Sequence, residues 1–224
     1  MMMNLFSVFD PVTSLNFSMN WISCLFMLMF MPVMYWLIPS RWNMLMYLLV
    51  EFLSNEFKVL MLNKMNMMNL LIYIGLFFFI MLNNLMGMFS YIFTSTSHLV
   101  ISLSMSLTLW MSFMIFGWFK NMNHMFIHLV PLGTPIMLMP FMVMIETISN
   151  IIRSGTLAVR LAANMIAGHL LMTLISSTGS NLSFLILMLM LFSQMMLIIL
   201  ELSVALIQAY VFSVLSTLYS TESN

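Results

Sequence analysis

Two long apolar segments, residues 136–176 and 183–219, close the sequence. As helices rising 1.5 Å per residue, each would run about 60 Å, twice the roughly 30 Å hydrocarbon thickness of a bilayer. Each segment is therefore either broken or steeply tilted. Because the tilt of a membrane helix is set by the elements packed against it, a tilted hairpin implies a large neighbouring partner.

The composition places the whole chain in a membrane. Of its 224 residues, 63% are hydrophobic and 5% are charged, whereas soluble domains carry about 25% charged residues. The six basic and six acidic residues cancel, which excludes a nucleic-acid binder that relies on a basic patch. The single cysteine, Cys24, excludes an internal disulfide and a cysteine-based metal site. We expect no metal and no other cofactor.

The earlier part of the chain contains three more predicted spans and one surface helix. The spans cover residues 15–38, 67–89 and 99–118, each with enough apolar residues to cross the hydrocarbon. Residues 40–66 alternate charged and apolar side chains, which predicts an amphipathic helix on the membrane surface. The fold class is therefore an all-α membrane protein, one integral domain over 1–224, with about five embedded helices and a long tilted hairpin at the end.

The basic residues predict the orientation. Arg41, Lys58 and Lys64 fall between the first two spans and Lys120 falls between the next two, so all four lie on one face. The positive-inside rule makes this the inner face. The N-terminus is then expected outside and the C-terminus inside.

Polar side chains form a stripe along the first long segment. At 100° per residue, one face carries a run at steps of four and three residues: Glu146, Asn150, Arg153, Leu157, Arg160 and Asn164. An ion in a bilayer costs roughly 3 kcal/mol on insertion scales and 10 or more in simulations, so such residues mark an ion or proton pathway by default. His169 lies about half a turn away from Arg160 and faces elsewhere. Arg153 either pairs with Glu146 or extends to the interface.

The second long segment carries a stripe of its own. Gln194, Glu201 and Gln208 recur every seven residues and return close to the same face, and Glu222 lies at the inner end. A helix–helix hydrogen bond is the alternative interpretation of Gln194. An arginine does not release its proton in a protein, whereas glutamate and histidine exchange protons. Simple antiparallel pairing about the turn 176–181 sets Glu201 opposite Thr156, not opposite His169.

Several motifs carry a resemblance to a known family. L-A-V-R-L-A-A-N-M-I-A-G-H at 157–169 is similar to the signature of the a subunits of F-type ATP synthases, in their mitochondrial, animal form. The resemblance covers nearly the whole chain and includes N-N-L-M-G-M at 83–88, Y-I-F-T-S-T-S-H at 91–98, H-L-V-P-L-G-T-P at 128–135, P-F-M-V-M-I-E-T-I-S-N-I-I-R at 140–153 and Q-A-Y-V-F-S-V-L at 208–215. Ser90 and Ser154 stand where relatives often have proline, so a helix break at 154 is less expected.

The resemblance implies a stationary proton-channel subunit beside a rotating ring of c subunits, with the peripheral stalk and other Fo subunits as neighbours in the mitochondrial inner membrane. Arg160 would face the carboxylate of the ring, supported by Asn164 and Gln208. His169 and Glu201 would line a half-channel to the intermembrane space, and Glu146 and Glu222 would line a half-channel to the matrix. Nucleotide chemistry would lie on other chains, because no G-x-x-x-x-G-K-[ST] loop is present.

Two other classes of membrane protein are open alternatives. A haem- or quinone-binding respiratory subunit needs histidines that face one another across helices, but only His169 lies well inside a predicted span. A secondary transporter commonly shows internal repeats, and none is visible. The polar residues outside the stripes are given structural roles. We expect His124 and His128 to lie in a loop or at an interface, and His98 to lie in a turn or at an interface. We expect Asn83 and Asn84 to pack against neighbours or to cap a helix.

Overall fold

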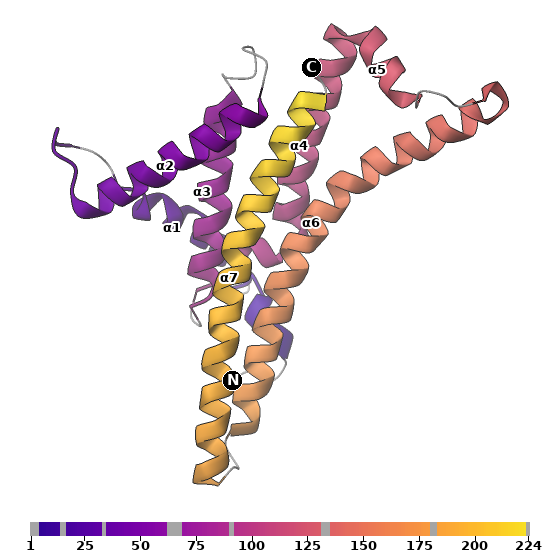
Figure 1. The fold of residues 1–224 in the computed structure, drawn as a ribbon. Helices are drawn as coiled ribbons and strands as arrows, with labels where there is room; N and C mark the ends of the chain where they lie inside the picture. The colour runs from indigo at the N-terminus through magenta and orange to yellow at the C-terminus, as the bar shows by residue number, and fades with distance from the viewer. Residues whose placement is uncertain are drawn as a thin grey trace.

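The computed structural model describes residues 5–13, 17–32, 35–61, 69–89, 92–130, 135–179 and 183–222, and the side chains of Leu5, His124, His128, Glu222 and residues 26–28 lie outside this description. In this part of the chain every regular element is a helix (Figure 1). The α-helices are α1 (Ser23–Phe30), α2 (Arg41–Leu60), α3 (Leu70–Gly87), α4 (Leu99–Lys120), α5 (Met122–Leu129), α6 (Met139–Thr178) and α7 (Phe184–Glu222). Short 3-10 turns are η1 (Leu5–Phe9), η2 (Met19–Ile22), η4 (Ser95–Ser97) and η5 (Ile136–Leu138).

Four helices are long and apolar enough to cross a membrane among the residues searched: Leu70–Gly87, Leu99–Lys120, Ile136–Thr178 and Phe184–Thr221. They correspond to the predicted spans 67–89, 99–118, 136–176 and 183–219, which confirms an all-α membrane fold. Between the second and third of these helices, the chain also forms the short helix α5.

The first predicted span, residues 15–38, differs in the structure. Among its described residues, only Ser23–Phe30 is α-helical, and eight residues are too few to cross the hydrocarbon. The helix ends where Met31 becomes extended, with ψ of 117°, immediately before Pro32. A residue that precedes proline is sterically driven out of the helical region, so the sequence itself supplies the break.

The amphipathic helix predicted over 40–66 is formed as α2, which begins at Arg41 and ends at Leu60. Ser40 caps its start by accepting a hydrogen bond from the backbone N–H of Asn43 at 3.4 Å. Its buried face presents Leu53 and Phe57 to the core that α3 and α7 share. The hydroxyl of Tyr210 on α7 donates to Glu56 at 3.2 Å, which fixes α2 against the hairpin. Residues 62–66 of the prediction lie outside the described residues.

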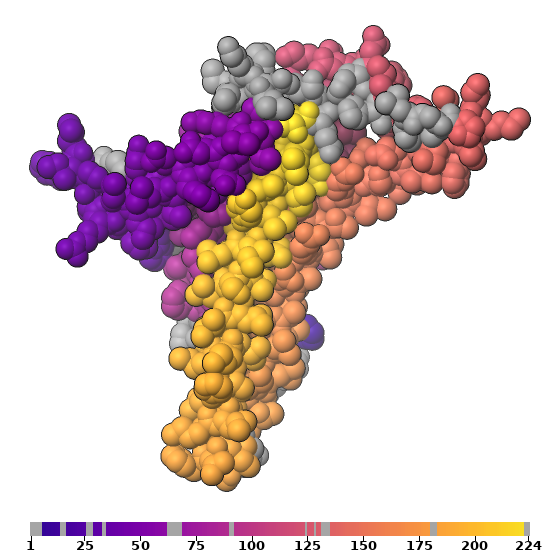
Figure 2. Space-filling model, viewed as in Figure 1, coloured from indigo at the N-terminus to yellow at the C-terminus, as the bar shows by residue number. Residues whose placement is uncertain are grey.

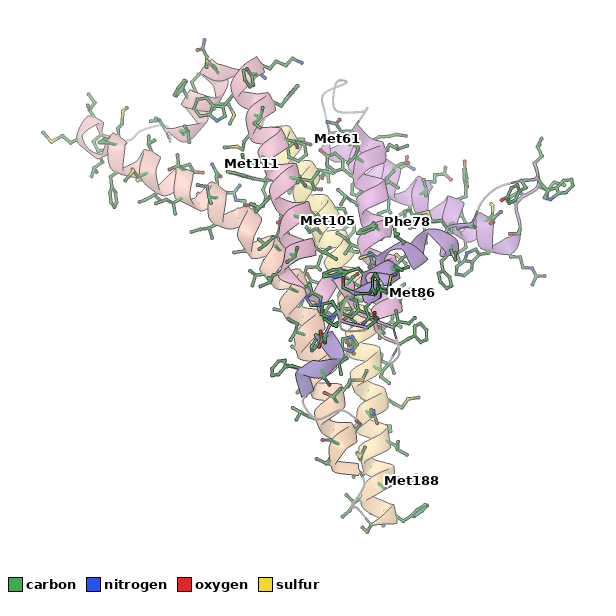
Figure 3. All side chains as sticks on the ribbon, turned by 180° about the vertical axis from the view of Figure 1, so that it is seen from behind. Met61, Phe78, Met86, Met105, Met111 and Met188 are labelled. Atoms are coloured by element: carbon green, nitrogen blue, oxygen red, sulfur yellow. The ribbon has the colours of Figure 1, made fainter. Side chains whose placement is uncertain are left out.

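The core lies where α2, α3, α4 and the hairpin meet. Its fully buried members come from four helices: Leu53, Phe57, Tyr73, Phe77, Phe78, Ile80, Leu157, Leu161, Ala209 and Phe212. Figure 3 shows Phe78 and Met105 among these helices, whereas Met188 lies near the far tip of the hairpin. Most large apolar side chains of α7 before Glu201 are exposed, as expected for a surface that faces lipid or another membrane subunit.

The long helices α6 and α7 are each unbroken, so tilt and curvature, not a break, accommodate their length. They lie side by side over the lower part of Figure 1 and separate toward the other end, where α6 leans away from α7. In the space-filling view the lower part of the hairpin projects beyond the other helices (Figure 2). This arrangement agrees with the predicted long tilted hairpin.

Candidate functional site: a buried pair and an exposed arginine on one helix

A histidine and a glutamate meet in the buried seam between α6 and α7. The Nε2 atom of His169 lies 3.7 Å from Oε1 of Glu201, and both residues are less than one-tenth exposed. The ring of Phe9, from the N-terminal turn η1, stands edge-on to the imidazole at 6.3 Å between centroids. The imidazole is also hydrogen-bonded to the backbone of Gly87 at the end of α3. Two further segments, η1 and the end of α3, therefore contact the imidazole of this pair.

Gly168 is what allows Glu201 to approach α6. A Cβ atom at position 168 would lie 2.7 Å from Oε1 of Glu201 and 2.8 Å from its Cδ, closer than real Cβ contacts come. Any other side chain at 168 would displace the carboxylate. Gly168 lies inside a continuous helix and makes no turn. Its role is to leave space for the carboxylate of Glu201.

The pairing that simple register counting gave, Glu201 opposite Thr156, is wrong. His169 lies nine residues before the end of α6, whereas Glu201 lies seventeen residues after the start of α7. Figure 1 shows the reason: α7 begins farther along the hairpin axis than the point where α6 ends. The connection between the two helices therefore runs along that axis. The offset brings Glu201 to His169 without a kink in either helix.

Arg160 lies on a different face of α6 from His169, as the helical spacing predicts. Its side chain is exposed, and so are its neighbours on that surface, Thr156, Val159 and Ala163. Among the residues that the structure describes, none forms an ion pair or hydrogen bond with the guanidinium. A cation on a largely apolar helix face of a membrane protein requires a partner, and none of the described residues supplies one.

The predicted polar stripe on α6 does not share one environment. Leu157 is buried and Arg160 is exposed, although they stand three residues apart, and Glu146, Asn150 and Arg153 are partly buried. Steps of four and three residues average less than the helical period, so such a stripe drifts around a straight helix by about 20° per heptad. The drift and the curvature of α6 divide the stripe between two sites.

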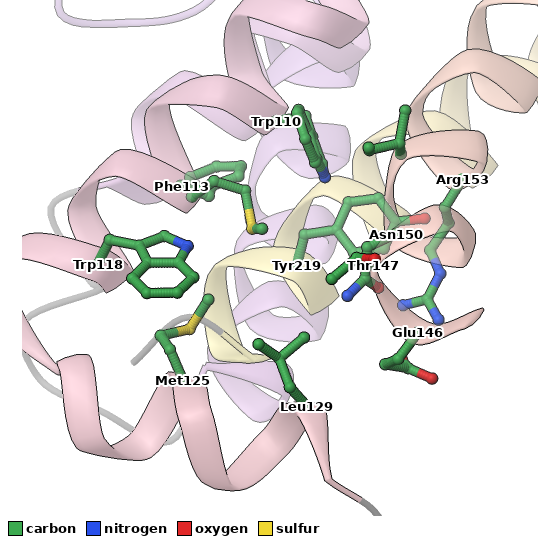
Figure 4. A pocket seen from close by; sticks show the side chains of 12 residues that line it. Trp110, Phe113, Trp118, Met125, Leu129, Glu146, Thr147, Asn150, Arg153 and Tyr219 are labelled. Atoms are coloured by element: carbon green, nitrogen blue, oxygen red, sulfur yellow. The ribbon is translucent and has the colours of Figure 1, made fainter. Parts of the chain in front are cut away.

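The first part of the stripe opens into a cavity of about 270 Å³ between α4, α5, α6 and the end of α7. Glu146, Asn150 and Arg153 line one side of it, and Trp110 and Trp118 line the other (Figure 4). The guanidinium carbon of Arg153 lies 5.7 Å from the centre of the Tyr219 ring. The cavity therefore offers a carboxylate in a partly apolar, partly polar space near the C-terminal end of α7.

The remaining candidates lie along the same hairpin. Asn164 and Gln208 are half-buried. Gln208 comes seven residues after Glu201 on α7, and Arg160 comes nine residues before His169 on α6. Because the two helices run antiparallel and His169 lies beside Glu201, Gln208 and Arg160 lie at a similar level along the hairpin. The side chain of Glu222, at the end of α7, lies outside the described part. Within that part no group of three or more metal-ligating side chains gathers.

Comparison with known proteins decides the family. The family model described as ATP synthase A chain matches residues 17–221, nearly the full length and including both long helices. The chain belongs to the ATP synthase A chain family. ATP synthase subunit a of Drosophila melanogaster is 56% identical over 224 residues and all of both chains. Subunit a of Locusta migratoria is 58% identical over 223 residues and 99% of both chains, and that of Anopheles gambiae is 56% identical over 226 residues and all of both.

Family membership agrees with the resemblance found in the sequence, and it does not favour the respiratory or transporter alternatives. Two features of the site could not be read from the sequence. The contact of Phe9 with His169 joins the N-terminal turn η1 to α6, far apart in the chain. The tight contact between Gly168 and Glu201 depends on the offset of the hairpin. The only feature of the sequence that pointed to the contact between Gly168 and Glu201 was a glycine beside a histidine in a long apolar run.

Proposed function

We propose that the chain is the proton-channel subunit of the membrane sector of an ATP synthase. The observation that carries the proposal is the division of α6 into two faces. One face presents Arg160 to the outside without a partner among the described residues, and another buries His169 against Glu201. A fixed cation beside two groups that exchange protons is the arrangement needed to separate two proton paths.

Each polar residue then has a distinct role. Arg160 faces the carboxylate of a passing c subunit, and Asn164 and Gln208 support it. His169 and Glu201 line the half-channel to the intermembrane space. Glu146 and Glu222 line the half-channel to the matrix, and the cavity that Glu146 lines supports this assignment.

The partners and the location follow from these roles. The exposed face around Arg160 meets a ring of c subunits, and peripheral-stalk and other Fo subunits cover further apolar surface. The chain is one integral domain of the mitochondrial inner membrane, and the nucleotide chemistry lies on other chains. The helix ends with Lys58 and Lys120 lie at the same end of the molecule as the C-terminus. This supports a C-terminus in the matrix and an N-terminus in the intermembrane space.

Reconstitution tests the proposed function. Vesicles that contain the c ring together with this chain should take up protons when a potassium diffusion potential is applied, and vesicles with the ring alone should not. Equal uptake in both preparations would refute the proposal. A visible haem band in the purified chain would instead support the redox alternative.

A substitution at Gly168 tests the buried pair. We expect Gly168→Ala to reduce proton uptake several-fold, because the added methyl group would lie 2.7 Å from Oε1 of Glu201 and would force the carboxylate away from His169. The matched control is Gly155→Ala on the same helix, where an added Cβ meets nothing within 4 Å. Replacing glycine by alanine in a helix is favourable by about 1 kcal/mol, so the control should assemble and conduct normally. Equal conduction in both variants would contradict the positioning role of Gly168.

A further inference from the structure

A cleft opens between the spanning helices α3 and α4, near the start of the first and the end of the second. Both helices pack against α7 but make little direct contact with each other (Figure 1). The gap leaves a cavity of about 250 Å³, and Ser220 near the end of α7 contributes to its lining. Because a protein cavity of about 150 Å³ can hold benzene, this one has room for part of a larger apolar molecule.

The lining of the cavity changes from apolar at its rim to polar at its inner end. Ile72 and Phe116 line the rim and are 53% and 42% exposed. Tyr73 and Ser220 line the inner end and are each 1% exposed. Both α3 and α4 are long and apolar enough to cross a membrane. A molecule that enters between them therefore comes from the bilayer.

The hydroxyl of Tyr73 is a buried donor at this inner end. Ser220 lies near enough to influence it, but no atom of the described residues accepts its proton with hydrogen-bond geometry. The hydroxyl of Ser220 donates to the carbonyl of Thr217 at 2.6 Å. On the facing wall, Ser112 donates to the carbonyl of Leu109 at 2.7 Å. Because a buried tyrosine hydroxyl usually has a partner, the cavity calls for a ligand that brings an acceptor oxygen.

The position of this hydroxyl is fixed by packing. The ring of Tyr73 belongs to the buried core, and it lies 6.2 Å from the ring of Phe113 between centroids. A ring held in this way does not turn its hydroxyl out to the membrane surface. The donor is therefore a permanent feature of the cavity wall.

A cation lies beside the rim. Lys120 is the last residue of α4, one turn after Phe116, and its Nζ atom lies 5.0 Å from the centre of the Phe116 ring. Among the described residues, no carboxylate forms an ion pair with it. A lysine at the end of a spanning helix extends its ammonium to the level of the lipid headgroups. Lys120 is thus placed to meet an anionic group there.

We infer that the cleft between α3 and α4 binds a phospholipid. An acyl chain lies between Ile72 and Phe116. An ester carbonyl oxygen accepts a hydrogen bond from Tyr73, and the phosphate lies against the ammonium of Lys120. A phospholipid carries all three groups in one molecule, whereas water does not match the apolar rim and a hydrocarbon does not match the donor or the cation. The inference goes beyond the proposed function, because it concerns a bound lipid and not the proton path.

Photolabelling tests whether an acyl chain enters the cleft. The intact complex is reconstituted in phosphatidylcholine vesicles that contain a trace of phosphatidylglycerol with a photoreactive acyl chain, and the labelled peptides are mapped. We expect label on the first turns of α3 and on the second half of α4. Ser112→Trp places a large side chain in the cavity and should lower this label several-fold. The matched control is Ser104→Trp, two turns earlier on α4, which is exposed and outside the cavity lining.

Two polar substitutions test how the lipid is held. Tyr73→Phe keeps the ring but removes the donor, and it should raise the amount of photoreactive lipid needed for half-maximal labelling roughly two- to tenfold, the range for one neutral hydrogen bond. Lys120→Gln should weaken labelling by the phosphatidylglycerol probe more than by a matching phosphatidylcholine probe, because only the first carries a net negative charge. Lys58→Gln, at an exposed lysine near the end of α2, should change neither.

The outcomes decide the inference independently of proton conduction. Equal labelling of Ser112→Trp and Ser104→Trp would mean that bilayer lipid only passes over the helix surface, which refutes the site. Native binding by Tyr73→Phe would also refute it, and so would label on a neighbouring subunit with none on α3. A complex that labels as expected but does not conduct protons would overturn the proposed function and leave the lipid site standing.

Discussion

Arg160→Ala should abolish proton-driven ATP synthesis while leaving the assembled complex intact. The guanidinium has no ion pair or hydrogen bond among the described residues, so its removal should cost the fold of the chain little. Under the proposed function, the substitution removes the fixed positive charge that attracts the carboxylate of the passing ring and separates the two proton paths. The measurement is the rate of ATP synthesis by inner-membrane vesicles under an imposed proton gradient.

The neighbouring residue provides the control for Arg160. Val159 lies on the same exposed face of α6 and is 53% exposed. Val159→Ala removes apolar surface but no charge, and it should support synthesis at close to the native rate. Normal coupled synthesis in Arg160→Ala would contradict the role of the arginine.

Glu201→Gln should have the next largest effect and should slow proton uptake by about tenfold or more. One positioned group that exchanges protons contributes roughly a hundredfold to ten-thousandfold to a catalysed proton transfer, so tenfold is a low threshold. Glutamine keeps the size of the side chain and can still lie beside His169, but it does not exchange a proton in this way. The measurement is the initial rate of proton uptake by reconstituted vesicles, compared with the amount of assembled complex.

Two further variants sharpen the test of Glu201. Ser203→Ala alters an exposed residue two positions away, whose hydroxyl bonds to the carbonyl of Leu200 at 2.7 Å, and it should conduct normally. Glu201→Asp keeps an ionisable group but shortens its reach, and it should fall between the native chain and Glu201→Gln. If Glu201→Gln conducts like Ser203→Ala, proton exchange at position 201 has no part in the mechanism.

The sequence allowed the main helices to be predicted because their signals are local. Long apolar runs indicate membrane helices, and four such runs correspond to α3, α4, α6 and α7. The position of Arg160 opposite to His169 also follows from helical geometry within one element. The first predicted span, by contrast, is interrupted before Pro32. A count of apolar residues does not register how a proline ends a helix, so it predicts a continuous span there.

Contacts between helices were harder to predict, because they depend on where a loop places the next helix. The register of α6 against α7 shows this: counting from the turn gives Thr156 as the neighbour of Glu201, and the structure gives His169. Asn83 and Asn84 illustrate the same limit. On the sequence they are two amides near a helix end, and only the packing of η4 against α3 and α6 buries them beside the hairpin.

The most direct measurement of the central claim is the structure of the intact ATP synthase in a lipid bilayer, determined by electron cryomicroscopy. The account predicts that the exposed face of α6 lies against the ring, with the guanidinium of Arg160 within roughly 6 Å of a ring carboxylate, the range over which opposite charges stabilise each other strongly. A guanidinium of Arg160 surrounded by lipid, or held far from every ring subunit, would contradict it.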